Sequence, residues 1–517
     1  MFLNKNKNKI LLLSIFTIAL IFRFYKFKES IYFAFDQARD TYISQDIYQK
    51  GDLKFIGPPV SGNLGLFHGV LFWYLLAPLD AIASGDPIII SVFFRIINAL
   101  GIFIVYVIGK RLFNSKVGLL SSLFFAVSFE QTQYSIYVGN PSLAVLSILL
   151  IFYGSTLLLS LNKNTKWSPL VMFSAAAIST QLNLMYFYTF FSVLIILFIF
   201  KKESLKIKFK YYLIAFLSSI LILSTYILVE IKYSFRSIQL AIKLLNQDFG
   251  ILNPNESKYI LFWNKYLTMF KDNFFGFFNN NLLLTIFIIL FTFLLILKAR
   301  KNKNYLLLLV WTMSWLILMF FGGHLAYYTN AGLSIGLLIV FASQIVKLNK
   351  YLSIILICLF IFGNIKQINA QNSNSLLVSF ASQTMMKLSD EYKLIDYLYR
   401  QANNQGFTIR VTGIPYKVQT IWAYLFNYYG KNKYNYLPYW ENENVLGFPG
   451  TLPTPKQGTT CLRFRVVEPS RGIPQNLIDE DLKTENYFSD IINQQNIGHF
   501  LIETRIAKDK NCHNSKP

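Results

Sequence analysis

Long apolar segments recur along the chain as far as residue 368, and short clusters of lysine and arginine separate them. Eleven of these segments are candidates for membrane-spanning helices: 10–27, 88–109, 117–136, 141–161, 168–182, 184–200, 211–231, 281–298, 305–322, 326–345 and 350–368. A helix needs about 20 mainly apolar residues to cross a bilayer, a length that these segments approach or reach. Only 15% of the residues are charged, whereas a soluble domain has about 25%. The pattern predicts a polytopic α-helical membrane protein with about 11 transmembrane helices.

The basic clusters predict how these segments are threaded. If eleven spans alternate, six clusters fall on one side: residues 5–9, 110–116, 163–166, 201–210, 298–303 and 347–350. Cytoplasmic loops carry an excess of Lys and Arg, so this side, with the N-terminus, is expected to be cytoplasmic. The extracytoplasmic side receives the first long loop (28–87), the loop 232–280, the short loop at Gly323 and His324, and the chain after residue 368. We therefore expect a multi-pass protein of the plasma (inner) membrane, in contact with membrane lipids.

The net charge of +23 raises the question of a nucleic-acid partner. The basic residues lie in short clusters between apolar segments, which is a topology signal and not a phosphate-binding face. We therefore expect no nucleic-acid partner. No CxxC or HExxH spacing occurs. The sequence thus indicates no metal site and no certain cofactor, although it does not exclude a divalent metal.

The composition changes after residue 368. Helical periodicity is found at 392–402, 418–429 and 475–483, and strand-like patterns are found at 407–414, 461–467 and 499–506. This predicts two domains, a transmembrane domain at 1–368 and an extracytoplasmic α/β domain at 369–517. Cys461 and Cys512 both fall in the second domain, and the sequence leaves open whether they pair.

The first outer loop opens with a cluster of ionisable residues beside the membrane. Asp36, Arg39 and Asp40 are spaced i, i+3 and i+4, so they share one face if a helix begins at Asp36 and ends before Gly51. The positive end of the helix dipole would keep Asp36 ionised. Ionisable groups at such a depth are costly unless they are paired or used. A helix cap with a surface ion pair is the simpler explanation, and a catalytic carboxylate is the functional one.

The segment 67–78 is apolar and aromatic but short, and counting it as a span would place Lys110 and Arg111 outside the cytoplasm. We expect a helix in the membrane interface, headed by His68. A histidine at that point could donate a hydrogen bond to a phosphate oxygen. Helix capping is the simpler role.

Two further outer positions carry polar side chains. Asn140 precedes Pro141 between the third and fourth predicted spans, which suits a helix cap and also places its amide where it could orient a substrate. His324, Tyr327 and Tyr328 lie between the ninth and tenth spans, where they could bind a phosphate or sugar hydroxyls. Interfacial tyrosines are also usual in membrane proteins.

Taken in order, these motifs resemble the GT-C superfamily of glycosyltransferases, in particular the bacterial relatives of the protein O-mannosyltransferases and of the lipid A aminoarabinose transferase. The resemblance covers roughly residues 1–200 and rests on Phe35–Asp40, Gly51–Leu53, Phe67–Leu75, Gly109–Phe113 and Asn140–Leu143. Farther along, only the hydropathy and the loop with His324, Tyr327 and Tyr328 match.

The resemblance implies a polyprenyl-phosphate-linked sugar as donor, a lipid, glycan or protein as acceptor, and transfer outside the cytoplasm. It implies that Asp36 is the base that accepts the proton of the acceptor hydroxyl in one inverting displacement. His68, Arg39 and His324 would stabilise the departing phosphate.

The chain departs from its relatives at two positions. The residue after the catalytic Asp is often acidic, and here it is Gln37. Asn140 stands where the aminoarabinose transferase has a second Asp before the Pro. The second difference removes a metal ligand or second base, which argues against a metal requirement.

A polyprenyl-lipid flippase or transporter is the second interpretation. Carriers place ionisable residues at the midplane of discontinuous helices. The main ionisable residues in or close to the predicted spans, Arg95 and Glu230, lie near span ends instead. A non-catalytic receptor, the third interpretation, would leave Asp36 and His68 without a function.

Overall fold

The computed structural model describes residues 2–60, 65–160, 165–245, 258–278, 280–321, 327–373, 383, 385–441, 445–455, 460–469 and 473–516. The chain forms two compact units. The first unit consists of residues 1–25, 53–72 and 92–370, and the second consists of residues 26–52, 73–91 and 371–517. Residues 26–52 and 73–91, which the sequence analysis assigned to the transmembrane domain, therefore belong to the same compact unit as the C-terminal residues. The domain division at residue 368 stays a prediction.

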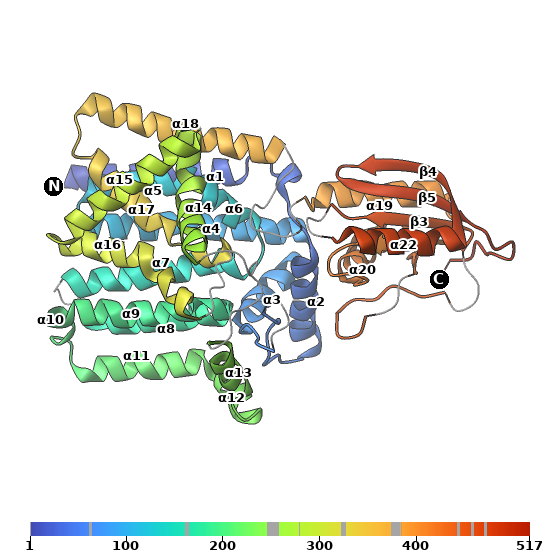
Figure 1. Ribbon diagram of the computed structural model, residues 1–517, viewed down its shortest axis with the longest axis horizontal. Helices are drawn as coiled ribbons and strands as arrows, with labels where there is room; N and C mark the ends of the chain where they lie inside the picture. The colour runs from blue at the N-terminus through green and yellow to red at the C-terminus, as the bar shows by residue number, and fades with distance from the viewer. Residues whose placement is uncertain are drawn as a thin grey trace. The chain divides into compact units, whose positions relative to one another are not determined.

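The first unit is built from helices, and each of the eleven predicted segments overlaps one or two helical elements (Figure 1). Its main helices, some of which extend beyond it, are α1 (Phe2–Arg23), α4 (Pro87–Leu112), α5 (Ser115–Val127), α6 (Phe129–Ile136), α7 (Asn140–Ser160), α8 (Ser168–Leu182), α9 (Tyr188–Ile199), α11 (Phe209–Ile222), α12 (Ser224–Lys232), α13 (Arg236–Leu245), α14 (Lys258–Phe278), α15 (Asn281–Ala299), α16 (Lys303–Met313), α17 (Ser334–Ile345) and α18 (Lys350–Ser373). Short 3-10 turns accompany them: η3 (Leu184–Phe187), η4 (Ser314–Phe321) and η5 (Tyr327–Asn330).

Within the described ranges, four helices are long and apolar enough to cross a membrane: α4, α7, α15 and the Lys350–Ala370 part of α18. A fifth is added if α11 and α12, which meet at a bend of 61°, count as one span. Of the other predicted spans, 10–27 lies mostly on the unbroken 22-residue helix α1, and the rest are shorter or broken in the structure. The total of 11 spans and their topology stay a prediction.

Close approach of backbones and aromatic packing hold the first unit together. A Cβ atom on Gly276 of α14 would lie 2.2 Å from the carbonyl oxygen of Gly363 of α18, so these two helices touch through glycines. Beside this crossing, the Phe274 ring lies edge-on to Phe341 and Phe360, at centroid distances of 5.2 and 5.5 Å.

The second unit contains a five-stranded sheet of order β2-β1-β3-β5-β4. Strand β1 is parallel to β2 and β3, whereas β5 is antiparallel to β3 and β4. Its elements are α2 (Phe35–Lys50), most of α3 (Leu71–Ala83), α19 (Leu388–Ala402), β1 (Phe407–Thr412), α20 (Thr420–Leu425), β2 (Tyr439–Trp440), β3 (Leu462–Val467), α22 (Gln475–Phe488), β4 (Ser489–Ile497) and β5 (Phe500–Ala507). The three predicted strands and three predicted helices of this region are confirmed, and β2 and β4 are additional.

Cys461 and Cys512, left open by the sequence, form a disulfide. It joins the residue before β3 to the segment that follows β5.

A short antiparallel ladder joins the first outer loop to the C-terminal residues within this unit. Tyr32 forms a bridge with Lys387. The Phe33 amide donates to the Met386 carbonyl at 3.4 Å, and the Leu388 amide donates to the Ile31 carbonyl at 3.1 Å. Helix α2 follows one side of this ladder and α19 follows the other, so the two helices start from a common point.

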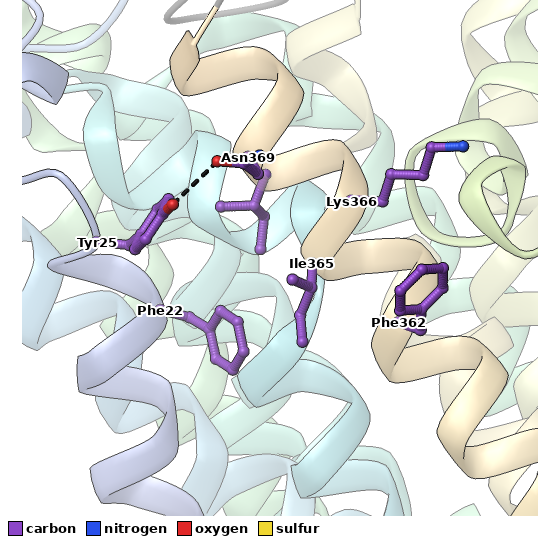
Figure 2. Close-up of a pocket in the computed structure, with 7 residues that line it drawn as sticks. Phe22, Tyr25, Phe362, Ile365, Lys366 and Asn369 are labelled. Carbon is purple, nitrogen blue, oxygen red and sulfur yellow. Dashed lines mark hydrogen bonds between the residues drawn. The ribbon is translucent and has the colours of Figure 1, made fainter.

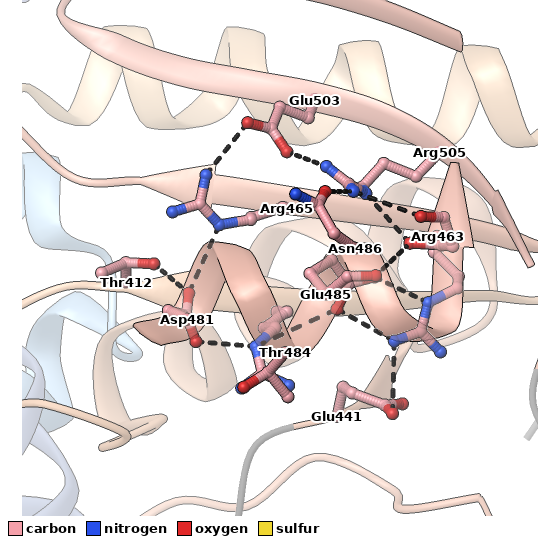
Figure 3. Close-up of polar contacts among 12 residues, drawn as sticks. Thr412, Glu441, Arg463, Arg465, Asp481, Thr484, Glu485, Asn486, Glu503 and Arg505 are labelled. Atoms are coloured by element: carbon pink, nitrogen blue, oxygen red, sulfur yellow. Dashed lines mark hydrogen bonds and ion pairs between the residues drawn. The ribbon is translucent and has the colours of Figure 1, made fainter. Parts of the chain in front are cut away.

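One face of the sheet is charged rather than apolar (Figure 3). Side chains two residues apart on a strand share a face, so Arg463 and Arg465 of β3 both point toward α22. Arg463 binds both carboxylate oxygens of Glu485 at 2.8 and 3.0 Å. Arg465 lies 3.4 Å from Asp481 and 3.0 Å from Glu503. Because both arginines are paired within this buried cluster, α22 is fixed to the sheet by ion pairs.

Candidate functional site

Helix α2 confirms the predicted helix at 36–50 and begins one residue earlier, at Phe35. The residue before it, Ala34, has no side chain that can cap the helix. Gln37 supplies part of the cap, because its side-chain oxygen accepts the Ala34 amide at 3.1 Å. The helix ends at Gly51, whose φ of 67° suits glycine. Gln37, which stands where relatives often have an acid, thus stabilises the start of the helix.

Arg39 joins the two carboxylates of this helix. Its Nη1 lies 2.8 Å from Asp36 Oδ1, and its Nη2 and Nε each lie 2.8 Å from Asp40 Oδ1. Trp73 Nε1 donates to the same Asp40 oxygen at 2.8 Å. The predicted shared face of Asp36, Arg39 and Asp40 is therefore present in the structure.

The two carboxylates differ in exposure. The Asp40 residue is 3% exposed, whereas the Asp36 side chain is 46% exposed. Burial raises the pKa of Asp40 to about 6, although the Arg39 charge and the Trp73 hydrogen bond act in the opposite direction. Asp40 therefore anchors Arg39 from the protein interior, and Asp36 is the carboxylate that a substrate can reach.

His68 does not head a helix, contrary to the prediction, because α3 begins at Leu71. The His68 amide donates to the Pro58 carbonyl at 2.8 Å, and a Cβ on Gly57 would lie 2.3 Å from the His68 carbonyl oxygen. These backbone contacts hold the residue in an extended segment. His68 therefore does not cap a helix, and its side chain binds the turn η3 instead.

The imidazole of His68 is oriented by η3. Its Nδ1 accepts the amide of Leu184 at 3.1 Å. A neutral imidazole that accepts at Nδ1 carries its proton on Nε2. His68 is largely buried, so water does not compete for Nδ1 and the proton stays on Nε2.

The same turn η3 also binds the segment that contains Tyr328. The Tyr186 hydroxyl donates to the Tyr328 carbonyl at 2.6 Å, and Tyr188, which follows the turn, donates to the Thr329 carbonyl at 3.1 Å. Two predicted site residues, His68 and Tyr328, are therefore attached to one short turn of the first unit.

Asn140 is half-buried and is the first residue of α7. No described contact joins it to His68 or Tyr328. Tyr327 starts η5, and His324 lies outside the described residues, so its predicted role has no structural counterpart here.

Sequence reasoning missed one cation near this turn. Lys265 of α14 is buried, and its Nζ contacts the Thr329 hydroxyl. It also lies 5.5 Å from the centre of the Trp315 ring. The only signal in the sequence is a lysine inside an aromatic, amphipathic stretch of the predicted outer loop.

A cavity of about 390 Å³ lies elsewhere in the first unit, between the end of α1 and α18 (Figure 2). Phe22, Phe362 and Ile365 make its wall apolar, and Tyr25 donates to Asn369 at 2.9 Å at one end. None of the predicted site residues lines it. In the described part of the chain, no group of three His, Cys, Asp or Glu side chains is arranged to hold a metal ion.

The chain is similar to known sugar transferases. The family described as dolichyl-phosphate-mannose-protein mannosyltransferase has a model that matches residues 68–228. ArnT from Cupriavidus metallidurans, in the crystal structure bound to undecaprenyl phosphate, has a similar fold. The TM-score is 0.59 at 8% identity, and the match covers 96% of this chain and 98% of ArnT. The chain resembles the GT-C glycosyltransferases. This confirms the resemblance predicted from the motifs in roughly residues 1–200.

Two further solved structures are similar to the chain. The apo state of ArnT gives a TM-score of 0.57 at 8% identity and covers 95% of this chain and 97% of ArnT. The Archaeoglobus fulgidus oligosaccharyltransferase gives a TM-score of 0.47 at 12% identity over 78% of this chain, which spans 62% of that protein's length. Among curated protein sequences, none matches the chain significantly. The matching family consists of glycosyltransferases, as the sequence analysis predicted.

Proposed function

We propose that this protein is an integral-membrane glycosyltransferase that moves a sugar from a polyprenyl-phosphate carrier to an acceptor hydroxyl, with inversion, on the extracytoplasmic side of the membrane. The observation that carries the proposal is the Arg39 bridge between exposed Asp36 and buried Asp40, in a chain with the GT-C fold. The acceptor is a lipid, a glycan or a protein.

Asp36 is assigned the role of general base. Its carboxylate is accessible, lies in the first turn of α2 and is held by Arg39 in one orientation. As the acceptor oxygen attacks the anomeric carbon, its proton passes to Asp36, and the bond from the sugar to the carrier phosphate breaks.

Stabilisation of the departing phosphate is assigned to His68, Arg39 and His324, the groups that the resemblance implies. His68 accepts the Leu184 amide at Nδ1, so its ring proton lies on Nε2. A cation and a fixed N–H act where negative charge develops on the leaving oxygen. ArnT, which has a similar fold, binds undecaprenyl phosphate in its crystal structure, and this supports a polyprenyl-phosphate donor here.

The proposed topology keeps the eleven spans, the cytoplasmic N-terminus and the extracytoplasmic C-terminal residues. The disulfide between Cys461 and Cys512 supports it, because disulfides persist in oxidising compartments and are rare in the cytosol.

The test compares the wild type with Asp36→Asn in nanodiscs, using radiolabelled polyprenyl-phosphate sugars and a membrane extract as acceptor. Asp46→Asn is the matched control, because Asp46 lies on the same helix and forms an i, i+4 ion pair with exposed Lys50 at 2.7 Å. We expect Asp36→Asn to lose transfer by at least about 100-fold while it still binds the carrier, and Asp46→Asn to keep it. Equal transfer by the wild type and Asp36→Asn would refute the role of Asp36.

A flippase remains the second candidate, because the structure contains a buried acid outside the Asp36 cluster, Glu130. Glu130 lies just after the break between α5 and α6, is 1% exposed, and accepts hydrogen bonds from Asn273 at 2.9 Å and from Ser334. Acids at broken helices are typical of carriers. Carrier translocation that survives Asp36→Asn but not Glu130→Gln, without sugar transfer, would favour the flippase.

A further inference from the structure

We propose that Gln383 is a positioning residue for Asp36: it caps the first turn of α2 and is itself held in place by Glu468. The inference rests on the proposed role of Asp36 and extends it, because it gives the C-terminal part of the chain a part in the chemistry. Both residues belong to the second compact unit.

The start of α2 needs an external cap. The first amides of a helix have no partner within the helix, and a side chain at the preceding position usually supplies one. Ala34 cannot do so. The Phe35 amide instead donates to Gln383 Oε1 at 3.2 Å, from a residue 348 positions farther along the chain. Phe35 is bonded directly to Asp36, so this hydrogen bond fixes the backbone from which the carboxylate projects.

The side-chain nitrogen of Gln383 is also hydrogen-bonded. Its Nε2 donates to the Ile414 carbonyl at 2.8 Å and to Glu468 Oε2 at 3.0 Å. Both partners are acceptors, so they require the amide nitrogen on their side and leave the oxygen for Phe35. Gln383 is 5% exposed, and water therefore does not replace these bonds.

Glu468 ties this contact to the sheet. Its backbone amide donates to the Thr412 carbonyl at 2.9 Å, which continues the pairing of β3 with β1. Its carboxylate also accepts the Ile414 amide at 3.2 Å and Trp422 Nε1 at 3.0 Å. Gly413 leaves room for it, since a Cβ there would lie 2.3 Å from the carboxylate.

The contacts form a continuous path from the sheet through Glu468 and Gln383 to the backbone of Asp36. A general base must be held in the geometry of the reaction, and a displacement of about 1 Å can cost 100-fold in rate. The cap therefore acts on the chemical step and not on carrier binding. Loss of Gln383 is expected to lower kcat about 10- to 100-fold and to leave the KM for the carrier unchanged.

The experiment uses the full-length protein in nanodiscs and Gln383→Met, which keeps the length and packing of the side chain and removes its hydrogen bonds. Gln475→Met is the matched control, because Gln475 is exposed on α22 and binds Asp479, at 2.9 Å, on the same helix. Transfer kinetics and hydrogen exchange over residues 33–40 are measured together. We expect faster exchange and lower kcat in Gln383→Met alone, with an unchanged KM.

Each other outcome overturns a specific part of the proposal. Unchanged exchange would show that Gln383 does not cap α2. Faster exchange with wild-type kcat would show that the cap does not position Asp36. If the wild type itself transfers no sugar, the proposed function fails while exchange still decides the cap. Should Gln383→Met not fold, Gln383→Asn takes its place, because its side chain is one methylene too short to bind Phe35 and Glu468 together, and the same faster exchange and lower kcat are expected.

Discussion

Trp73 donates its indole N–H to Asp40 Oδ1 at 2.8 Å, and Arg39 binds the same oxygen. Two side chains thus converge on one buried oxygen, which leaves Asp40 with a structural role and makes it the anchor of the guanidinium that also binds Asp36. The two acids of the cluster should therefore respond differently to substitution and to pH.

Asp40→Asn should lower transfer about 10-fold and remove an acidic limb from the pH profile. Burial raises the pKa of Asp40 to about 6, so protonation below pH 6 weakens its hold on Arg39. The pKa in the native state lies above the unfolded value of about 3.9, so Asp40 makes the free energy of unfolding fall as pH rises from about 4 to about 6. Transfer rates from pH 5 to 8 check the limb. Its persistence in Asp40→Asn would assign it to another group.

His68→Asn and His68→Gln should separate the two functions of the imidazole. The amide of Asn can replace Nδ1 and accept the Leu184 amide, but it offers no donor at the position of Nε2. The amide of Gln can replace Nε2. We expect His68→Gln to keep more transfer activity than His68→Asn, by about 10-fold. The reverse order, measured under saturating carrier, would mean that the bond to Leu184 is what matters.

Asp481→Asn should destabilise the second unit by about 3–5 kcal/mol, because it removes a fully buried carboxylate that pairs with both Arg410 and Arg465 and leaves them only Glu485 and Glu503. Asp481 is fully buried, lies 2.7 Å from Arg410 Nε and 3.4 Å from Arg465 Nε, and accepts the Thr412 hydroxyl. Asp479→Asn, an exposed change two residues away on α22, should cost less than about 0.5 kcal/mol. Chemical denaturation monitored by tryptophan fluorescence measures both. Similar midpoints for the two variants would contradict the importance of the buried cluster.

Replacement of Cys512 by serine should lower the free energy of unfolding of the second unit by about 4 kcal/mol. The disulfide closes a loop with a sequence separation of 51, and restricting a loop of that length in the unfolded chain is worth about this much. Cys358→Ser, in α18, is the control. Unfolding in the absence of reductant provides the measurement, and equal stability of the two variants would contradict the expectation.

Patterns that depend on local spacing were predictable from the sequence. Helix α2 followed from the i, i+3, i+4 spacing of Asp36, Arg39 and Asp40 and from Gly51, and the helical segments followed from hydropathy. Strand β4 was missed because it is an edge strand, mostly exposed, with the polar run Asn493–Asn496 in place of an alternating pattern.

Contacts between distant segments were not predictable. The apolar residues after His68 suggested a helix beginning there, whereas pairing with residues near Pro58 keeps His68 extended. The alternation in β3 predicted a strand, but it did not indicate that α22 supplies the counter-charges of its arginines. Nothing near Gln383 indicates that it binds Phe35, because the partner is defined only by the fold.

The hydrogen bond from Phe35 to Gln383 has a consequence for how the protein is made. A ribosome synthesises Phe35 348 residues before Gln383, with most of the hydrophobic helices in between. During that interval the nascent chain carries Asp36 on a helix whose first amide lacks the Gln383 cap. Under the proposed function and topology, catalytic competence would arise late in biogenesis, when the residues around Gln383 have been translocated and folded, and prematurely terminated chains would insert into the membrane without consuming the carrier.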